Sequence, residues 1–146
     1  MEGYLTEQYI NHVDTTFANL GSPFPSNETE KSGLEEWYER VYRLPFSRFT
    51  AEDLARSCRQ NLFLGQIVPF VLDALDRNPI AGELFDGELF FSLSLIPIDF
   101  WNTNSKFRIH LKTFFRESKQ LLNDCLDEYD KADLVNLLSI LEEKWD

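Results

Sequence analysis

The chain has little of what a catalytic site usually needs. It contains two histidines, His12 and His110, and neither has a cysteine, aspartate or glutamate at a spacing typical of metal ligands. It has no glycine-rich phosphate loop, and no serine lies in a nucleophile elbow. The sequence therefore predicts no catalytic residue, no bound metal and no cofactor.

Long apolar runs and cysteines are also scarce. No run reaches the roughly 18 apolar residues of a membrane-spanning helix, and the uncharged stretch 89–98 is interrupted by two serines and a proline. The first residues lack the basic start and apolar core of an export signal, so we expect a cytoplasmic protein. Cys58 and Cys125 could pair, but free buried thiols are the expectation in that compartment.

Basic residues are outnumbered, with 14 lysines and arginines against 25 acidic residues and a net charge of −11. Phosphate binding needs a basic surface, so this balance weighs against nucleic acid as a direct ligand. It is compatible with a basic protein partner, whose approach opposite charge would accelerate. On charge alone, simple solubility is the more ordinary explanation, and the charge does not by itself indicate a partner.

Enough apolar surface is present for a core, because 43% of the residues are hydrophobic and 14% are aromatic. The apolar spacing is helical and no convincing alternating strand pattern occurs, which predicts an all-α fold. We expect a compact single-domain bundle of about five to seven helices. Residues 1–30 are expected to form a loosely packed N-terminal arm and linker, and residues 31–146 the helical domain.

Six helices follow from the apolar spacing and the cap signals. They cover residues 32–44, 51–61, 62–78 and 87–95, then a long helix from residue 104 or 105, and a last helix after residue 130. Ser32 begins a capping box, and Thr50, Asp86 and Asp130 are expected to cap later helices. Pro69 lies inside the third pattern, so this helix should either kink there or begin just before it.

The densest apolar stretch runs from residue 76 to residue 101 and includes Leu84, Phe85 and Phe90. So many apolar side chains must be buried either in the core or in a partner. The breakers Gly87 and Pro97 frame a short helix, so the core is the expected location.

Two acidic clusters are candidate binding sites. The first places Glu83, Asp86 and Glu88 around Gly82 and Gly87, where they could bind a cation or a basic partner. Their spacing does not match a calcium loop, and nothing visible separates their pKa values for acid–base catalysis. A structural role is the simpler alternative, with Asp86 as a helix cap and Glu88 as an acid in the first helical turn.

The second acidic cluster surrounds an aromatic residue at a turn between two helices. Its members are Asp124, Asp127, Glu128, Tyr129, Asp130 and Asp133. Such a corner is usually solvated, but acids around an exposed aromatic residue can also dock a basic protein. Spacing does not separate these two readings.

A set of short motifs occurs in order between residues 44 and 101. The motifs are Leu44-Pro45-Phe46, Thr50 with Glu52-Asp53-Leu54, Gln60, Leu64, Val68-Pro69, Leu72, Leu75, Asn78-Pro79, Gly82-Glu83, Asp86-Gly87-Glu88-Leu89, Leu95, Pro97 and Phe100-Trp101. This ordered set resembles the family of contact-dependent growth inhibition (CDI) immunity proteins. The sequence departs from the family's pattern at Phe85, where tyrosine is common, and at Glu88, where aspartate is common. The resemblance reaches neither residues 1–30 nor the last helix.

The resemblance implies a small cytoplasmic protein of a bacterium that also carries a CDI toxin. Such a protein binds the C-terminal toxin domain delivered by neighbouring siblings and blocks it. These toxins are often nucleases with basic active-site clefts, which an acidic inhibitor can fill or flank. Specificity is expected from exposed charges and from segments outside the resemblance. The candidate toxin-binding residues are Glu83, Asp86, Glu88, Asp124, Asp127, Glu128, Tyr129 and Asp130.

Two other classes of function stay open on the sequence. A helical adaptor or regulatory domain with a basic cellular partner would have the same composition. A hydrolase that uses Glu83, Asp86 and Glu88 is the third reading, but it lacks a histidine, metal ligands and oxyanion donors nearby.

Overall fold

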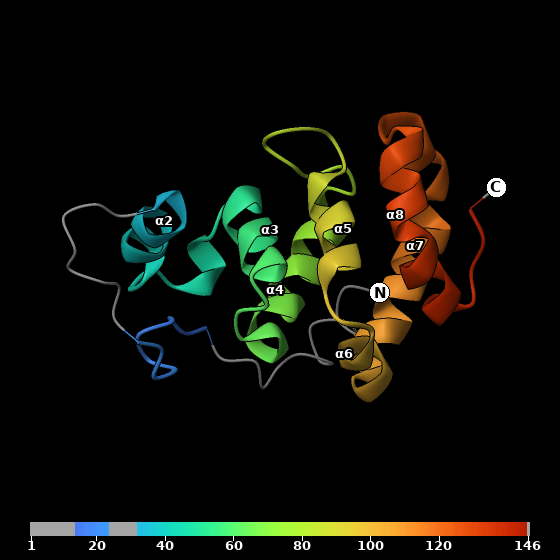
Figure 1. Ribbon diagram of the computed structural model, residues 1–146. Helices are drawn as coiled ribbons and strands as arrows, with labels where there is room; N and C mark the ends of the chain where they lie inside the picture. The colour runs from blue at the N-terminus through green and yellow to red at the C-terminus, as the bar shows by residue number, and fades with distance from the viewer. Residues whose placement is uncertain (1–13, 24–31, 146) are drawn as a thin grey trace. The chain divides into compact units, whose positions relative to one another are not determined.

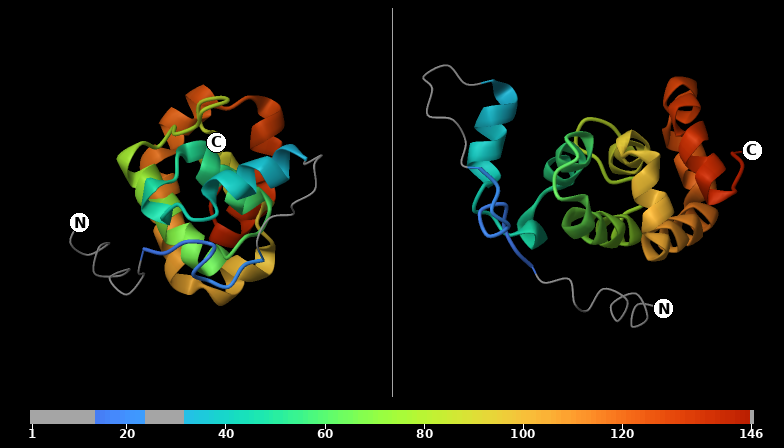
Figure 2. Two further views of the ribbon diagram at one scale, coloured as in Figure 1. Left: turned by 90° about the vertical axis from the view of Figure 1, so that its left-hand side faces the viewer. Right: turned by 60° about the horizontal axis from the view of Figure 1, so that its bottom comes forward.

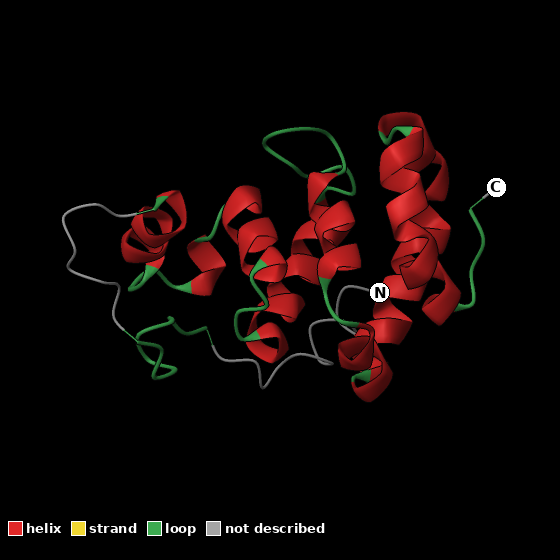
Figure 3. Cartoon of the chain, viewed as in Figure 1, coloured by secondary structure: helices red, strands yellow, loops and turns green. Residues whose placement is uncertain are grey.

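The computed structural model of the protein describes residues 14–23 and 32–145. In these residues the chain forms seven α-helices, two short 3-10 helices and no strand, which confirms the predicted all-α class (Figures 1 and 3). The elements are α2 (Gly33–Val41), η1 (Phe46–Arg48), α3 (Ala51–Arg59), α4 (Leu64–Arg77), α5 (Glu88–Ser92), η2 (Leu93–Leu95), α6 (Ile98–Thr103), α7 (Ser105–Cys125) and α8 (Glu128–Leu141).

The chain divides into two compact units, Met1–Thr50 and Ala51–Asp146. The boundary predicted between residues 30 and 31 borders residues outside the described ranges and stays a prediction. The weak helical spacing of Leu5, Tyr9, Val13 and Phe17 in the sequence also lies mostly outside those ranges.

In the first unit, α2 begins with the predicted capping box. The backbone N–H of Glu35 donates to Ser32 Oγ at 3.1 Å, and the N–H of Ser32 donates to Glu35 Oε1 at 3.2 Å. These two bonds satisfy backbone donors that the first helical turn leaves unpaired. The helix buries Trp37 and ends at Val41, three residues before the end of the predicted span 32–44.

Residues 14–23 are packed more tightly than the loose arm expected for this segment. Phe17 is fully buried in a cluster of aromatic rings. Its ring centroid lies 5.2 Å from that of Phe46, 5.4 Å from Tyr38, 5.7 Å from Phe49 and 6.4 Å from Trp37. Phe17 is the one buried apolar side chain of this turn, so spacing within the segment could not predict its packing.

In the second unit, α5 and η2 occupy the centre, as predicted for the span 87–95. Helix α5 contacts α3 and α4, and η2 contacts α3 and α8 (Figure 1). Leu89, Phe90 and Leu93 are fully buried. Leu95 is exposed, so one end of the span reaches the surface.

The helices around this centre mostly follow the prediction. Helix α4 starts at Leu64 and continues through Pro69, and α7 starts at Ser105. Helix α6 was not predicted from the sequence, because Pro97 indicates the end of the preceding helix. Pro97 also serves as the N-cap of α6. Proline is well tolerated at the start of a helix, because its φ is fixed and the helix does not need its N–H.

Two cap predictions are wrong. The N-cap of α5 is Gly87, in the left-handed region at φ 89°, and no side chain caps this helix, so Asp86 does not. The N-cap of α8 is Asp127, whose Oδ1 accepts from the N–H of Asp130 at 2.8 Å. Asp130 was expected to cap this helix, with Asp133 three residues later. Asp127 and Asp130 have the same spacing, and the helix begins at Glu128, directly after Asp127.

Candidate functional site

The loop between α4 and α5 is closed by backbone hydrogen bonds. The N–H of Gly87 donates to the carbonyl of Ile80 at 2.9 Å, and the N–H of Leu89 donates to the carbonyl of Ala81 at 3.0 Å. These bonds bring the two ends of residues 80–87 together, which is typical of a compact surface loop. We call residues 80–87 the closed loop; it lies at the top of Figure 1, above α5.

Glu88 holds the closed loop from beneath. The residue is 2% exposed, and its Oε1 accepts from the N–H of Glu83 at 3.0 Å and from the N–H of Leu84 at 3.1 Å. Its Oε2 lies 3.6 Å from Nη1 of Arg59 on α3. A carboxylate with two backbone donors and a nearby guanidinium is well compensated for its burial. Glu88 therefore has a structural role inside the molecule, and its oxygens do not face solvent.

Glu83 ties the closed loop to α3. Its Oε2 accepts from the backbone N–H of Glu52 at 2.9 Å. Glu52 is the second residue of α3, so Glu83 supplies from 31 positions later the type of hydrogen bond that an N-cap side chain provides. The negative charge is also favourable at that helix end because of the helix dipole.

Glu52 completes this group of charges. Its Oε2 lies 3.1 Å from Nη2 of Arg59. Burial raises the pKa of the Glu52 carboxyl, and a hydrogen bond with Glu88 raises it further, while Arg59 lowers it.

The second acidic cluster lies at the turn from α7 to α8. Tyr129 is 85% exposed there, the largest exposure among the exposed hydrophobic residues of the described chain. Glu128 is also exposed and lies 3.4 Å from Nζ of Lys131. Partial burial raises the pKa of Asp130, and the neighbouring charges of Asp127 and Asp133 raise it further. A cation placed at this turn would relieve that repulsion.

The structure brings the two clusters together through Gly87 and Leu126. A Cβ atom added to Gly87 would lie 2.8 Å from Cδ2 of Leu126, so the glycine backbone rests directly on this buried leucine. Asp86 and Asp127 are the chain neighbours of these two residues. The closed loop and the α7–α8 turn lie at the same end of the second unit, the top of Figure 1 and of the left view of Figure 2. We call this end the acidic end.

Two apolar side chains of the closed loop are exposed, although they were expected in the core. Leu84 is 73% exposed and Phe85 is 39% exposed. The Phe85 ring packs against Phe91 with 6.2 Å between the centroids, so Phe85 turns back toward α5. Leu84 is largely exposed to solvent. Composition could not reveal this, because the exposure depends on how Glu88 folds the loop.

The histidine and the cysteines have structural surroundings. His110 is buried, and its Nε2 lies 2.7 Å from Oδ2 of Asp76. Cys58 and Cys125 are both free, as expected, although Cys125 is only half-buried. Within residues 14–23 and 32–145 no group of three or more metal-ligating side chains converges. His12 lies outside the described residues.

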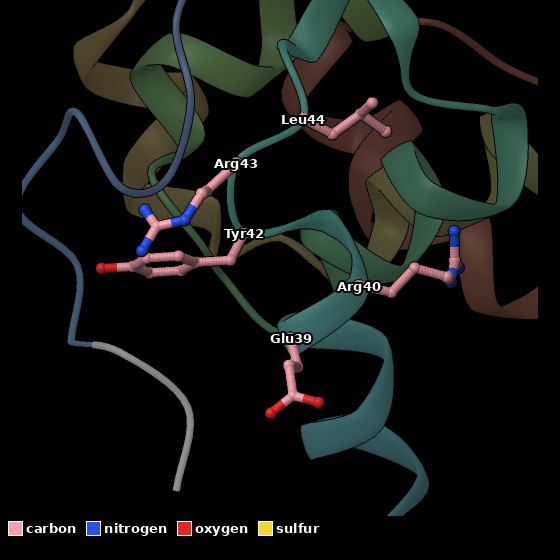
Figure 4. Close-up of a pocket in the computed structure, with 5 residues that line it drawn as sticks. All are labelled: Glu39, Arg40, Tyr42, Arg43 and Leu44. Carbon is pink, nitrogen blue, oxygen red and sulfur yellow. The ribbon is translucent and has the colours of Figure 1, made fainter.

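A separate hollow of about 390 Å³ lies on the first unit (Figure 4). It is lined by Glu39, Arg40, Tyr42, Arg43 and Leu44. The guanidinium carbon of Arg43 lies 5.4 Å from the centroid of the Tyr42 ring, in a cation–π arrangement. Glu39 and Arg40 extend away from each other in Figure 4, so the hollow holds no convergent set of catalytic groups.

None of the helices in the described part of the chain is long and apolar enough to cross a membrane. No curated protein matches the sequence significantly. The family model described as CDI immunity proteins matches residues 20–111, which is well over half of the chain. The match contains the stretch 44–101 and the closed loop, and it begins earlier than expected, within the segment assigned to the arm. It ends inside α7, before the α7–α8 turn. The chain belongs to the family of CDI immunity proteins.

Proposed function

We propose that this protein binds the toxin domain of the CDI system it belongs with, in the cytoplasm, and thereby neutralises it. Membership of the immunity family is the observation that carries this proposal. The protein acts by binding and not as an enzyme. The toxin domain we expect is a nuclease, because a nuclease has a basic cleft for phosphates and this chain has a net charge of −11.

The acidic end is the proposed toxin-binding surface. It combines exposed carboxylates from two segments with one highly exposed aromatic side chain. Its proposed contact residues are Glu83, Asp86, Asp124, Asp127, Glu128, Tyr129 and Asp130. Opposite charges across an interface speed the encounter and favour the correct partner, while an aromatic side chain supplies apolar area that can be buried. Glu88 is buried, so its role in this surface is to hold the closed loop.

The position of the acidic end relative to the family match supports this choice. The closed loop lies inside residues 20–111, whereas the α7–α8 turn lies outside them. One surface thus joins a segment that the family model covers with one that it does not. Such a combination suits a protein that must keep a common scaffold and still recognise one particular toxin.

The proposal is tested by co-expressing the protein with the toxin domain encoded beside it and counting surviving cells. The protein should restore growth, and the double variant Asp124→Lys, Glu128→Lys should weaken both protection and binding. The control for charge reversal away from this surface is Asp99→Lys on α6, which lies at the opposite end of the second unit, the bottom of Figure 1. It should protect like the unchanged protein. Absence of protection and of binding by the unchanged protein would refute the proposal, and recovery of a housekeeping protein in a pull-down would then favour the adaptor.

A further inference from the structure

Leu84 is the most exposed leucine among the exposed large hydrophobic side chains, at 73%. A single exposed leucine is common on protein surfaces and by itself has no meaning. The local structure sets Leu84 apart, because a buried carboxylate and several hydrogen bonds fix the backbone at this position.

The backbone N–H of Leu84 itself donates to the buried carboxylate of Glu88 at 3.1 Å. The preceding N–H, of Glu83, donates to the same oxygen at 3.0 Å. The Glu83 side chain is bound in turn to the N-terminus of α3 through the N–H of Glu52. The loop tip is therefore held at consecutive residues from two helices, although its side chains lie in solvent.

Gly82 makes this arrangement possible. A Cβ atom there would lie 2.7 Å from Cβ of Glu88 and would overlap the carbonyl oxygen of Phe85. Only glycine lets the backbone approach α5 so closely. A loop built this way loses little conformational entropy on binding, and preorganisation of that kind is an established source of affinity.

The chemistry around Leu84 identifies the kind of surface that fits it. Glu83 precedes it, and Asp86 lies two residues beyond it, so its immediate rim is acidic. Phe85 and the exposed Tyr129 add apolar area at the same end of the molecule. The complementary surface is an apolar pocket rimmed by lysine or arginine side chains. Interface energy usually concentrates in a few central apolar residues with a polar rim around them.

We infer that Leu84 is an apolar anchor that inserts into a pocket with a basic rim on the bound toxin domain, and that Glu88 is the positioning residue that presents it. This inference rests on the proposed function and adds the residue that contributes most to the affinity. Glu88 does not touch the toxin domain; it acts through the loop that carries Leu84.

The first test replaces Leu84 by alanine and measures binding to the catalytically inactivated toxin domain encoded beside this gene. We expect the affinity to fall by roughly 10- to 100-fold, the value of burying most of a leucine side chain. The matched control is Ile109→Ala, because Ile109 is 59% exposed and lies about 24 Å along α7 from the α7–α8 turn. Ile109→Ala should leave the affinity unchanged. An affinity of Leu84→Ala within about 3-fold of the unchanged protein would overturn the inference.

The second test asks whether Glu88 acts through Leu84. Glu88→Ala should weaken binding in the unchanged protein and have little further effect in the Leu84→Ala background, since interacting residues are not additive. Glu88→Gln keeps an oxygen acceptor for both N–H groups and should recover most of the affinity. Fully additive losses would show that Glu88 does not position Leu84.

Protein folding is monitored separately in these variants. In the unchanged protein the amide hydrogens of Glu83 and Leu84 should exchange slowly despite their exposed location, because both are hydrogen-bonded. Fast exchange at both amides would contradict the rigid loop even if Glu88→Ala did not fold. If the unchanged protein fails to bind the toxin domain, the proposed function fails; if it binds and Leu84→Ala binds equally well, only this inference fails.

Discussion

Gly82→Ala is the sharpest perturbation of the closed loop, because it adds a single methyl group where the backbone has no room for one. The added Cβ would lie 2.7 Å from Cβ of Glu88 and 3.0 Å from its backbone nitrogen, and it would overlap the carbonyl oxygen of Phe85. The closest of these neighbours is a backbone atom, so rotation of a flexible side chain cannot relieve the overlap. The loop backbone must move away from α5.

That movement stretches the bonds that Glu83 and Leu84 donate to Glu88. Each is a hydrogen bond to a charged acceptor, worth about 1.5–3 kcal/mol net. Loss of one bond together with some residual strain gives an expected destabilisation of about 2–4 kcal/mol. The Glu88 carboxylate would also stay buried with fewer hydrogen-bond donors, which destabilises the folded protein further.

The free energy of unfolding is measured by denaturant titration, with a probe of helical structure as the readout. Gly65→Ala is the matched control, since Gly65 lies in α4 and nothing approaches within 4 Å of its added Cβ. Alanine is the better helix former, so the control should be stabilised by about 0.5–1 kcal/mol. Opposite signs for the same substitution are therefore expected. A Gly82→Ala protein as stable as the unchanged one would refute the close packing of the closed loop.

Three further predictions concern the caps and the ionisable groups. Asp127→Ala should destabilise the protein by about 1 kcal/mol in a denaturant titration, because it removes the N-cap bond to Asp130, and an unchanged midpoint would contradict the cap. The Cys58 thiol should resist a disulfide reagent at pH 8 while the protein is folded, because burial raises its pKa to about 12; rapid labelling would contradict that burial. Because the pKa of Glu52 is raised above its usual 4.5 in the folded state, its contribution to stability is present at low pH and is lost as the pH rises through the folded pKa. Relative to Glu52→Gln, the unchanged protein should therefore gain stability as the pH falls from 7 toward that range, and parallel pH profiles would contradict the shift.

Local signals predicted the parts of the fold that depend on neighbours in the sequence. The Ser32–Glu35 capping box and the start of the long helix near Ser105 are both confirmed, because caps and helical spacing act over three or four residues. The central burial of α5 followed from the density of apolar residues around Phe90.

The candidate site depends instead on contacts between distant residues. Glu83 bonds to α3 from 31 positions away, and Gly87 rests on Leu126, so no local spacing indicates either contact. For the same reason Glu88 was grouped with exposed carboxylates although it is buried, and Leu84 was grouped with the core although it is exposed. The acidic composition predicted the charge of a binding surface, and only the fold shows which carboxylates can form one.

Calorimetric titration of the purified protein with the inactivated toxin domain encoded beside it tests the central claim most directly. We predict saturable one-to-one binding with a Kd well below about 1 μM, and an affinity that falls as salt is added, because salt screens the attraction between opposite charges across the interface. No measurable heat or binding at micromolar concentrations, under conditions in which both proteins are folded, would contradict it.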